Sequence, residues 1–169
     1  AAQAIGTSIG DDKVGTFGDF SIFSFHSHKN ITTLGEGGML IVDNEEISKE
    51  IPKLRHNGHC DFDYSRNEYW KPAMGNLDIS VINNEMFFPN NYCITEVQCA
   101  LGSILLDRVY DINSSKRRRA IRFIEELKEF DILNFHKVDS LQHNYHLLAA
   151  YFNNHEVRDR FIELMANEE

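Results

Sequence analysis

Two apolar runs of this chain are joined by the segment Ser24-Phe25-His26-Ser27-His28-Lys29-Asn30-Ile31-Thr32-Thr33-Leu34-Gly35-Glu36-Gly37-Gly38. Residues 20–25 alternate apolar and hydroxyl side chains and residues 39–42 are all apolar, so both runs are predicted to be buried strands. Burial lowers the pKa of a lysine, and a neutral lysine amine can attack a carbonyl carbon. Lys29 is therefore a candidate Schiff-base lysine, although spacing alone favours a surface lysine in a turn equally well.

The composition indicates a folded protein that handles small molecules. The chain has 169 residues, of which 42% are hydrophobic, and a formal net charge of −9. This charge argues against nucleic acid as a partner, because nucleic-acid binding is driven by neutralisation of phosphates. No apolar run approaches the ~18–20 residues of a membrane span, so no membrane contact is predicted. The three cysteines, Cys60, Cys93 and Cys99, make a poor disulfide framework and favour a reducing, cytoplasmic location.

Helix signals alternate with strand signals, which predicts an α/β fold. A helix is expected over residues 45–55, interrupted or kinked at Pro52. Thr95 and Gln98 fit a capping box, followed by one long helix or two nearly collinear helices up to about residue 130. A strand is expected around residues 145–151, and a last helix over 156–165. Residues 57–92 show no clear period and are interpreted as a functional or contact-making segment.

Four stretches of the chain together resemble one family. Ser24-Phe25-His26-x-x-Lys29 followed by Thr33-x-Gly35-Glu36-Gly37-Gly38 resembles the signature of the DegT/DnrJ/EryC1/StrS family of sugar aminotransferases, which use pyridoxal 5′-phosphate (PLP). Residues 1–4, 55–58 and 91–98 resemble three further family segments, in the same order along the chain.

The resemblance implies a fragment of a fold-type-I aminotransferase, with an α/β fold built on a mostly parallel central sheet. Residues 1–108 would form the C-terminal part of the PLP-binding large domain. Residues 109–169 would begin a smaller C-terminal α+β domain. Because the chain lacks an initial methionine and stops within a helical pattern, both of its ends are expected to be truncated.

The resemblance also assigns roles to five residues. Lys29 would bind the cofactor as a Schiff base and carry the proton between substrate and cofactor. Ser24 would bind the cofactor phosphate, Gln3 would lie near the 3-hydroxyl of the ring, and His26 would lie beside the ring or the substrate. Asn91 would reach across a homodimer interface to the phosphate in the neighbouring subunit. Active sites would thus be shared across the interface.

Two departures from the family pattern bear on the chemistry. The aspartate that pairs with the pyridine nitrogen should come one residue before Ala1, outside this sequence. Cys93 stands where the family usually has arginine, which puts any anion contact of that arginine in doubt. A branch of the family that removes a hydroxyl group has histidine in place of the lysine; here Lys29 is retained and His28 is merely its neighbour, so transamination is favoured over dehydration.

The predicted reaction moves an amine from glutamate (or glutamine) to a keto-sugar, giving an amino sugar for lipopolysaccharide or another surface glycan. Residues 88–93 and 143–148 resemble the subgroup that aminates the 8-keto derivative of an octulosonic acid. A nucleotide-linked keto-hexose is the alternative substrate. A non-catalytic relative that binds cofactor or sugar and regulates is the alternative from another class.

Two polar clusters invite other interpretations. His56, His59, Cys60, Asp61 and Asp63 include zinc-ligand types and could serve a metal-dependent hydrolase, but no second ligand pair follows at a familiar spacing, so no metal is predicted. The basic run at residues 116–119 is interpreted as a solvated helix face, because the chain as a whole is acidic.

Overall fold

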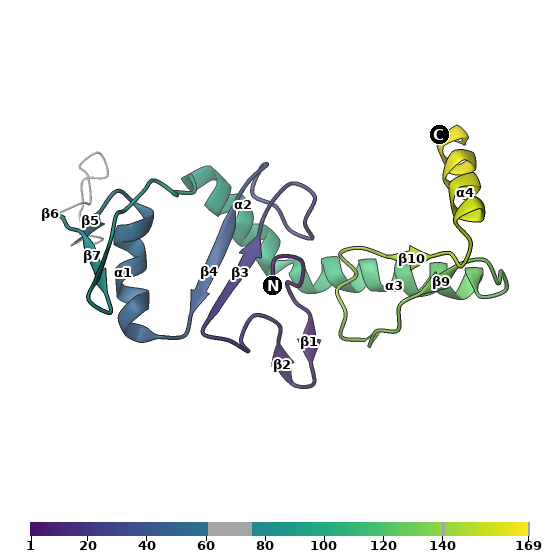
Figure 1. Cartoon of the computed structure of the whole chain (residues 1–169), viewed down its shortest axis with the longest axis horizontal. Helices are drawn as coiled ribbons and strands as arrows, with labels where there is room; N and C mark the ends of the chain where they lie inside the picture. Colours follow the sequence, from purple (N-terminus) through teal and green to yellow (C-terminus); the bar gives the residue numbers. More distant parts are fainter. Residues whose placement is uncertain (61–75, 140, 169) are drawn as a thin grey trace.

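The computed structural model describes residues 1–60, 76–139 and 141–168. It is an elongated molecule (Figure 1). A central strand pair, β3 (Phe20–Ser24) and β4 (Gly38–Val42), has α1 (Glu45–Arg55) on one side and α2 (Glu96–Asp107) crossing close by. Helix α3 (Val109–Leu127) leads away from this centre, and α4 (His155–Asn167) stands at the far end of the molecule.

Every strand pairing in the described part of the chain is antiparallel and two-stranded. In the central pair Phe20 lies opposite Val42 and Ser24 opposite Gly38. The described residues therefore contain no parallel sheet, and the prediction of a mostly parallel one is not met within them. A parallel connection needs a crossover, usually a helix, whereas residues 25–37 fold back without one.

The remaining strands are short: β1 (Ser8–Ile9) pairs with β2 (Asp12–Lys13), β5 (His59–Cys60) with β6 (Asn76–Leu77), β7 (Ser80–Ile82) with β8 (Glu85–Phe87), and β9 (Asn134–Phe135) with β10 (Ala150–Tyr151). Most of them lie in segments that gave no strand signal in the sequence. Residues 57–92, interpreted above as one irregular segment, contain four of them.

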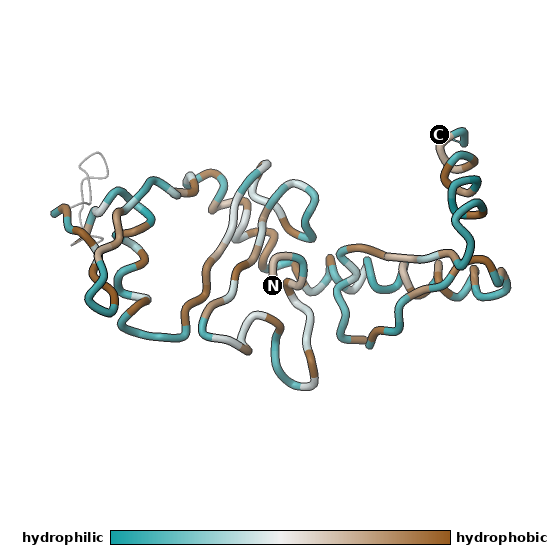
Figure 2. Tube along the Cα trace, in the orientation of Figure 1, coloured by the Kyte–Doolittle hydropathy of each residue, from teal (hydrophilic) through white to brown (hydrophobic). Residues whose placement is uncertain are grey.

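The predicted strands are present, but they are not buried in this chain. Phe20 is 54% exposed and Ile22 59%, and Met39 and Leu40 are also exposed. Figure 2 shows these hydrophobic runs side by side at the centre of the molecule. The accessible surface is 12676 Å², roughly half as much again as the ~8,500 Å² of a compact monomer of this mass. The apolar faces of β3 and β4 are thus free to contact other protein surfaces.

The helices follow their sequence signals closely. The Asn44 side chain accepts a hydrogen bond from Ile47 N (3.0 Å) at the start of α1, and Pro52 lies inside the continuous helix. Both bonds of the predicted Thr95–Gln98 capping box are present at the start of α2. The long helical region consists of two helices that meet at Arg108, which is also the proposed end of the large domain. In the described residues no helix is long and apolar enough to cross a membrane.

The strand predicted around residues 145–151 is mostly absent, and only Ala150 and Tyr151 are paired. Tyr145 has φ of 46°, in the left-handed region, which does not fit an extended strand. The preceding residue, Asn144, is buried, and its side chain donates hydrogen bonds to the backbone of Gln3 and Ile5, far away in the sequence. The long-range hydrogen bonds of Asn144 therefore override the local preference of this segment for a strand.

Candidate functional site

Backbone hydrogen bonds within the segment that carries Lys29 hold it in a closed loop. Phe25 N donates to Gly37 O (2.8 Å) and Ser27 N to Gly35 O (2.7 Å), so the chain leaves β3 and returns to β4 as a closed loop. Lys29 N donates to His26 O (2.9 Å), which places Lys29 in a tight turn inside this loop. Lys29 is half-buried, and it is not enclosed between two buried strands as its sequence frame predicts.

The loop has features that suit a phosphorylated cofactor. The buried Oγ1 of Thr32 has no hydrogen-bond partner among the described residues. Ser24 Oγ accepts from His26 N (3.4 Å), and no hydrogen bond within the described ranges uses its hydroxyl hydrogen, which can therefore donate to a ligand. A phosphate needs several donors of this kind. These residues therefore fit the phosphate end of PLP, the role proposed for Ser24.

Gly37 allows the close approach that shapes this loop. Thr33 is 1% exposed and donates through Oγ1 to Glu36 O (3.0 Å), and a Cβ added to Gly37 would overlap Thr33 Oγ1. A Cβ on Gly102 of α2 would lie 2.9 Å from Thr33 Cγ2, so Thr33 is confined from both sides. Residue 37 is thus restricted to glycine by packing, next to the predicted phosphate contact.

Replacing Gly37 by alanine is expected to weaken PLP binding by about tenfold or more in the whole protein. Accommodating the methyl group requires Thr33 Oγ1 to leave its position beside Glu36 O, or the loop backbone to shift, and overpacking of this kind costs ~1–3 kcal/mol. The measurement is a fluorescence titration of the cofactor. Gly18→Ala is the matched control, because its added Cβ would meet only Phe20 O at 3.8 Å. Equal affinities in the two variants would contradict the expectation.

His26 is oriented by two partners. Its Nδ1 accepts from His28 N (3.2 Å), so in the neutral ring the hydrogen resides on Nε2. Nε2 lies 3.4 Å from Glu36 Oε1. The ring thus bridges the two ends of the loop around Lys29, and its proposed place beside cofactor or substrate is compatible with this fixed orientation.

The residue after Lys29 is anchored in a buried polar network. Asn30 Nδ2 donates to Asn113 Oδ1 (2.7 Å) and to Asn144 O (3.2 Å). Asn30 Oδ1 accepts from Lys116 Nζ (2.9 Å) and lies 3.2 Å from His146 Nδ1. Asn30, Asn113 and Asn144 are all buried. The Lys29 loop is therefore fastened to α3 and to residues 143–146.

Gln3 is joined to this network by its backbone. Asn144 Nδ2 donates to Gln3 O (2.8 Å) and to Ile5 O (3.1 Å), and Asn113 Nδ2 donates to Ile5 O (2.9 Å). The Gln3 side chain itself is exposed. Hydrogen bonds thus join the N-terminal segment, the Lys29 loop, α3 and residues 143–146. Four of the five predicted site residues lie in or next to the first two of these segments: Gln3, Ser24, His26 and Lys29.

The fifth, Asn91, is held elsewhere. It forms an antiparallel bridge with His56, just beyond the C-terminal end of α1, and its Oδ1 accepts from Cys93 N (3.1 Å). Asn91 is exposed, and no described interaction joins it to the Lys29 loop. A contact of Asn91 with a cofactor in a second subunit remains a prediction.

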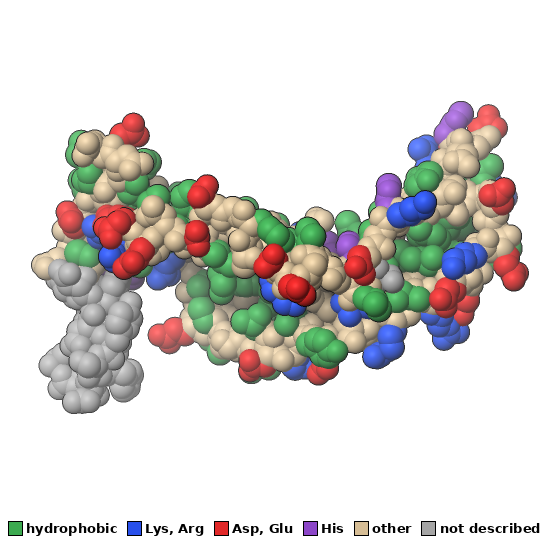
Figure 3. All heavy atoms as spheres, turned by 90° about the horizontal axis from the view of Figure 1, so that it is seen from below, with side chains coloured by type: hydrophobic (Ala, Val, Ile, Leu, Met, Phe, Trp, Pro, Cys, Tyr) green, Lys and Arg blue, Asp and Glu red, His purple; other side chains and the backbone are tan. Residues whose placement is uncertain are grey.

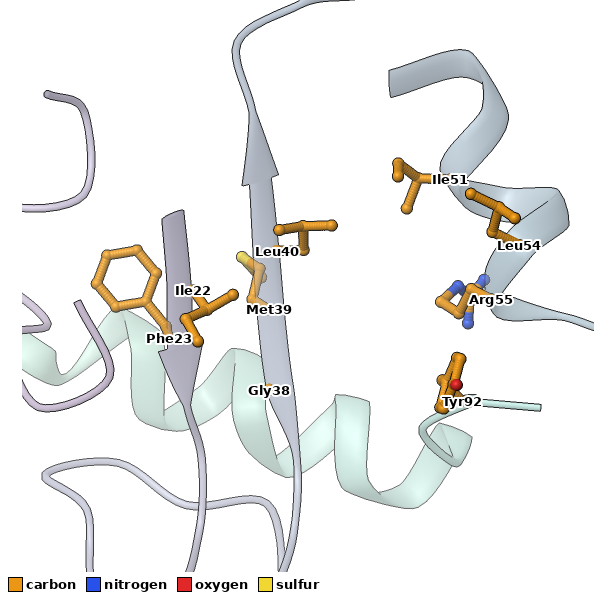
Figure 4. A pocket seen from close by; sticks show the side chains of 9 residues that line it. All are labelled: Ile22, Phe23, Gly38, Met39, Leu40, Ile51, Leu54, Arg55 and Tyr92. Atoms are coloured by element: carbon orange, nitrogen blue, oxygen red, sulfur yellow. The ribbon is translucent and has the colours of Figure 1, made fainter. Parts of the chain in front are cut away.

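Cys93 stands where the family usually has arginine, but the guanidinium group of Arg55 lies beside it. Arg55 Nη1 lies 3.7 Å from Cys93 Sγ, which in turn lies 3.7 Å from Arg55 O. Arg55 and Tyr92 line an apolar pocket of about 490 Å³ between β3, β4 and α1 (Figure 4). Ile22, Met39 and Leu40 line this pocket from the strands, and the Leu40 side chain points towards Ile51 and Leu54 of α1. None of the predicted site residues is among the residues that line it.

The basic run on α3 is only partly a solvated face. Lys116 donates to Asn30, and Arg117 Nε donates to His143 O (3.3 Å), whereas Arg118 and Arg119 are exposed. Burial, together with the charge of Arg119, lowers the pKa of Lys116. The interpretation of the whole run as surface charge is therefore wrong for its first two residues.

The metal-ligand hypothesis finds no support in the described residues. The rings of His56 and His59 lie 4.8 Å apart, but no group of three or more histidine, cysteine or acidic side chains there could hold an ion. Asp61 and Asp63 lie outside the described residues.

Sequence reasoning missed the residues that fasten the Lys29 loop: Asn30, Asn113, Asn144, Lys116 and His146. They are single polar residues far apart in the chain, with no shared period. Residues 143–148 resemble a family segment in sequence. Only the folded structure shows that two of them, Asn144 and His146, contact Asn30.

Comparisons with known proteins agree on one family. The family model described as the DegT/DnrJ/EryC1/StrS aminotransferase family matches residues 1–169. A UDP-4-amino-4,6-dideoxy-N-acetyl-beta-L-altrosamine transaminase of Campylobacter jejuni is 36% identical over 131 residues, covering 78% of this chain and 30% of the relative. A GDP-perosamine synthase of Vibrio cholerae is 31% identical over 148 residues, covering 88% and 35%.

A solved structure shares the fold. The Escherichia coli GDP-4-keto-6-deoxy-D-mannose-3-dehydratase with bound hydrated PLP superimposes with a TM-score of 0.76 at 19% identity, over 99% of this chain and 43% of that one. The chain thus spans less than half the length of each of these proteins.

Proposed function

The chain belongs to the DegT/DnrJ/EryC1/StrS aminotransferase family, and from this premise we propose that the protein uses PLP to transfer an amine from glutamate to a keto-sugar. The observation that carries the proposal is a lysine at position 29, on a closed loop whose neighbours can donate to a phosphate. We also propose that residues 1–108 belong to the PLP-binding domain and that residues 109–169 begin the small domain.

When bound, PLP supplies an electron sink for the carbon that gains or loses the amine. The chain's own residues would do the rest. Lys29 would hold the cofactor and would carry the proton at its amine. Ser24 and Thr32 would donate to the phosphate through their hydroxyls, and Gln3 would lie near the 3-hydroxyl of the ring. His26, oriented by His28 and Glu36, would lie beside the ring or the substrate.

Retention of lysine at position 29 supports transamination over dehydration, because the dehydrating branch carries histidine there. It also argues against a non-catalytic regulator, which carries out no reaction that would require a lysine at this position. Two keto-sugar classes are proposed as acceptors. The phrases at residues 88–93 and 143–148 support an 8-keto octulosonic acid. The names of the two relatives refer to UDP- and GDP-linked sugars and support a nucleotide-linked keto-hexose.

A homodimer with shared sites is proposed from the surface of the chain. Figure 3 shows apolar side chains reaching the surface across the middle of the molecule. Phe88 and Tyr92, which flank Asn91, are 75% and 71% exposed. Burial of such side chains in a subunit interface would stabilise the dimer by ~25 cal/mol per Å² of apolar surface, and would carry Asn91 towards the neighbouring site.

A single-turnover experiment with the whole protein tests the proposal. Glutamate is expected to convert the bound cofactor to its pyridoxamine form, seen as a loss of yellow absorbance. Addition of one keto-sugar class, but not the other, should restore the colour. Borohydride reduction before glutamate is expected to fix the cofactor on the peptide that contains Lys29. A label on another lysine, or no conversion by either glutamate or glutamine, would overturn the proposal.

A further inference from the structure

The side chain of Gln98 joins the first turn of α2 to the loop that carries Lys29. Its Nε2 donates to Glu36 O (2.9 Å), 62 residues away in the sequence, and its Oε1 accepts from Thr95 N (3.0 Å). A backbone N–H can only donate and a carbonyl oxygen can only accept, so these two partners fix the orientation of the amide. The oxygen of Gln98 therefore caps the helix, while its nitrogen holds the loop.

The carbonyl that Gln98 holds lies where the loop closes. Glu36 O also accepts from Thr33 Oγ1 (3.0 Å), and Thr33 is 1% exposed. The next carbonyl, Gly37 O, accepts from Phe25 N (2.8 Å) at the start of the loop. A shift of the peptide that joins Glu36 to Gly37 therefore disturbs the hydrogen bond that closes the loop. Gln98 restrains this peptide from outside the loop, because it belongs to α2.

The side chain of Glu36 contacts the ring of His26. Its Oε1 lies 3.4 Å from His26 Nε2, and the Glu36 side chain is 80% exposed. Since packing does not hold so exposed a side chain, its position depends on that of its own backbone. His26 O accepts from Lys29 N (2.9 Å) in the turn that carries the lysine. Contacts therefore run from Gln98 through Glu36 and His26 to the backbone of Lys29.

We propose that Gln98 is a positioning residue for this loop: by holding Glu36 O, it keeps the Glu36 carboxylate against His26 and the loop closed around Lys29. The inference rests on the proposed roles of Lys29 and His26 in transamination. Asn30 fastens the loop to α3, and Gln98 adds an attachment to α2. A misplacement of about 1 Å can cost a reaction ~10²-fold in rate, so a loop that carries reacting groups benefits from both attachments.

One substitution separates the two tasks of Gln98. In Gln98→Glu the side chain keeps an acceptor for Thr95 N, and glutamate serves as well as glutamine in a capping box. The carboxylate has no hydrogen to donate, so the bond to Glu36 O is lost. Gln142→Glu is the matched control. Gln142 is also half-buried, and its amide likewise accepts from a backbone N–H and donates to a backbone carbonyl, both of Gly10 (3.1 and 2.9 Å).

Hydrogen exchange of the whole protein without cofactor gives the first readout. The amides of Phe25, Ser27 and Lys29 form the hydrogen bonds of the loop. Their exchange is expected to be about threefold or more faster in Gln98→Glu than in wild type, because one hydrogen bond that restrains the loop is lost. Exchange at residues 99–102 of α2 should stay unchanged, since the cap is kept, and Gln142→Glu should match wild type in both segments.

Two results of this measurement would overturn the proposal. One is equal exchange of the loop amides in Gln98→Glu and wild type. The other is an equal loss of protection in the loop and in α2, which would make Gln98 a helix cap only. The measurement uses neither cofactor nor substrate, so its result stands apart from any failure to observe transamination.

The second readout is the half-reaction with glutamate in the holoenzyme. Gln98→Glu should lower the rate constant at saturating glutamate by about tenfold and leave the apparent dissociation constant within about twofold, since the loop positions groups that act after the donor has bound. Because Gln98 acts through Glu36, its substitution should have little further effect in a Glu36→Ala protein. Rate losses that multiply in the double variant, or a change confined to the dissociation constant, would contradict the assignment.

Discussion

Replacing Lys29 by alanine in the whole protein is expected to slow the half-reaction with glutamate by about 10³-fold or more. The residue supplies both the attachment of the cofactor and the movement of the substrate proton, and a positioned acid–base group alone contributes 10²–10⁴-fold. The measurement is stopped-flow absorbance of the cofactor after mixing with glutamate. The alanine variant should still bind PLP, but borohydride should no longer fix it to the peptide that contains residue 29.

Lys13→Ala is the control for this change. Lys13 is an exposed lysine in the β1–β2 hairpin, and the one hydrogen bond of its amine among the described residues is to Ser8 Oγ (2.9 Å). It should retain both the half-reaction and the label at Lys29. Partial rescue of Lys29→Ala by added methylamine would assign the lost activity to the missing amine. A Lys29→Ala protein that converts glutamate at the wild-type rate would remove Lys29 from the reaction.

Local signals in the sequence predicted the helices well. Asn44 and Thr95 cap α1 and α2 where their residue types suggest, because a cap depends on side chains within three residues of the helix start. The central strand pair was also correctly placed, because alternation and apolar runs are local signals. The local pattern made Lys29 a candidate Schiff-base lysine, and the family resemblance added the cofactor, which no local pattern could have named.

Partners far apart in the sequence could not be predicted. Asn30 and Asn144 are separated by 114 residues, and each looks like an ordinary loop asparagine until the fold joins them. Asn144 also explains the missing strand around residue 145, since a buried asparagine with four long-range hydrogen bonds overrides strand preference. The prediction that β3 and β4 are buried was wrong for a related reason. An apolar run indicates that a strand can be covered by another surface, but it does not indicate that this surface belongs to the same chain.

Replacing Asn144 by alanine is expected to lower the free energy of unfolding of the whole protein by about 3 kcal/mol. The side chain donates to Gln3 O and Ile5 O and accepts from His146 N, and it is 2% exposed. Its removal takes the Asn144 side-chain partner from Gln3 O and His146 N, at ~1–3 kcal/mol each, whereas Ile5 O still accepts from Asn113 Nδ2. Denaturant unfolding measures the loss, and hydrogen exchange at residues 3–7 and 29–31 should rise with it.

The exposed Asn153→Ala is the control, and it should change stability by less than about 0.5 kcal/mol. Asn144→Asp separates hydrogen bonding from packing. Its carboxylate keeps the acceptor for His146 N but faces two carbonyl oxygens to which it cannot donate, so it should destabilise more than alanine at pH 7. Protonation restores a donor, so the folded state raises the pKa of this carboxyl group. The deficit of Asn144→Asp should therefore shrink as the pH falls towards the ordinary aspartate value of about 4. A deficit that is constant with pH, or an Asn144→Ala protein as stable as wild type, would show that the network does not hold the Lys29 loop in place.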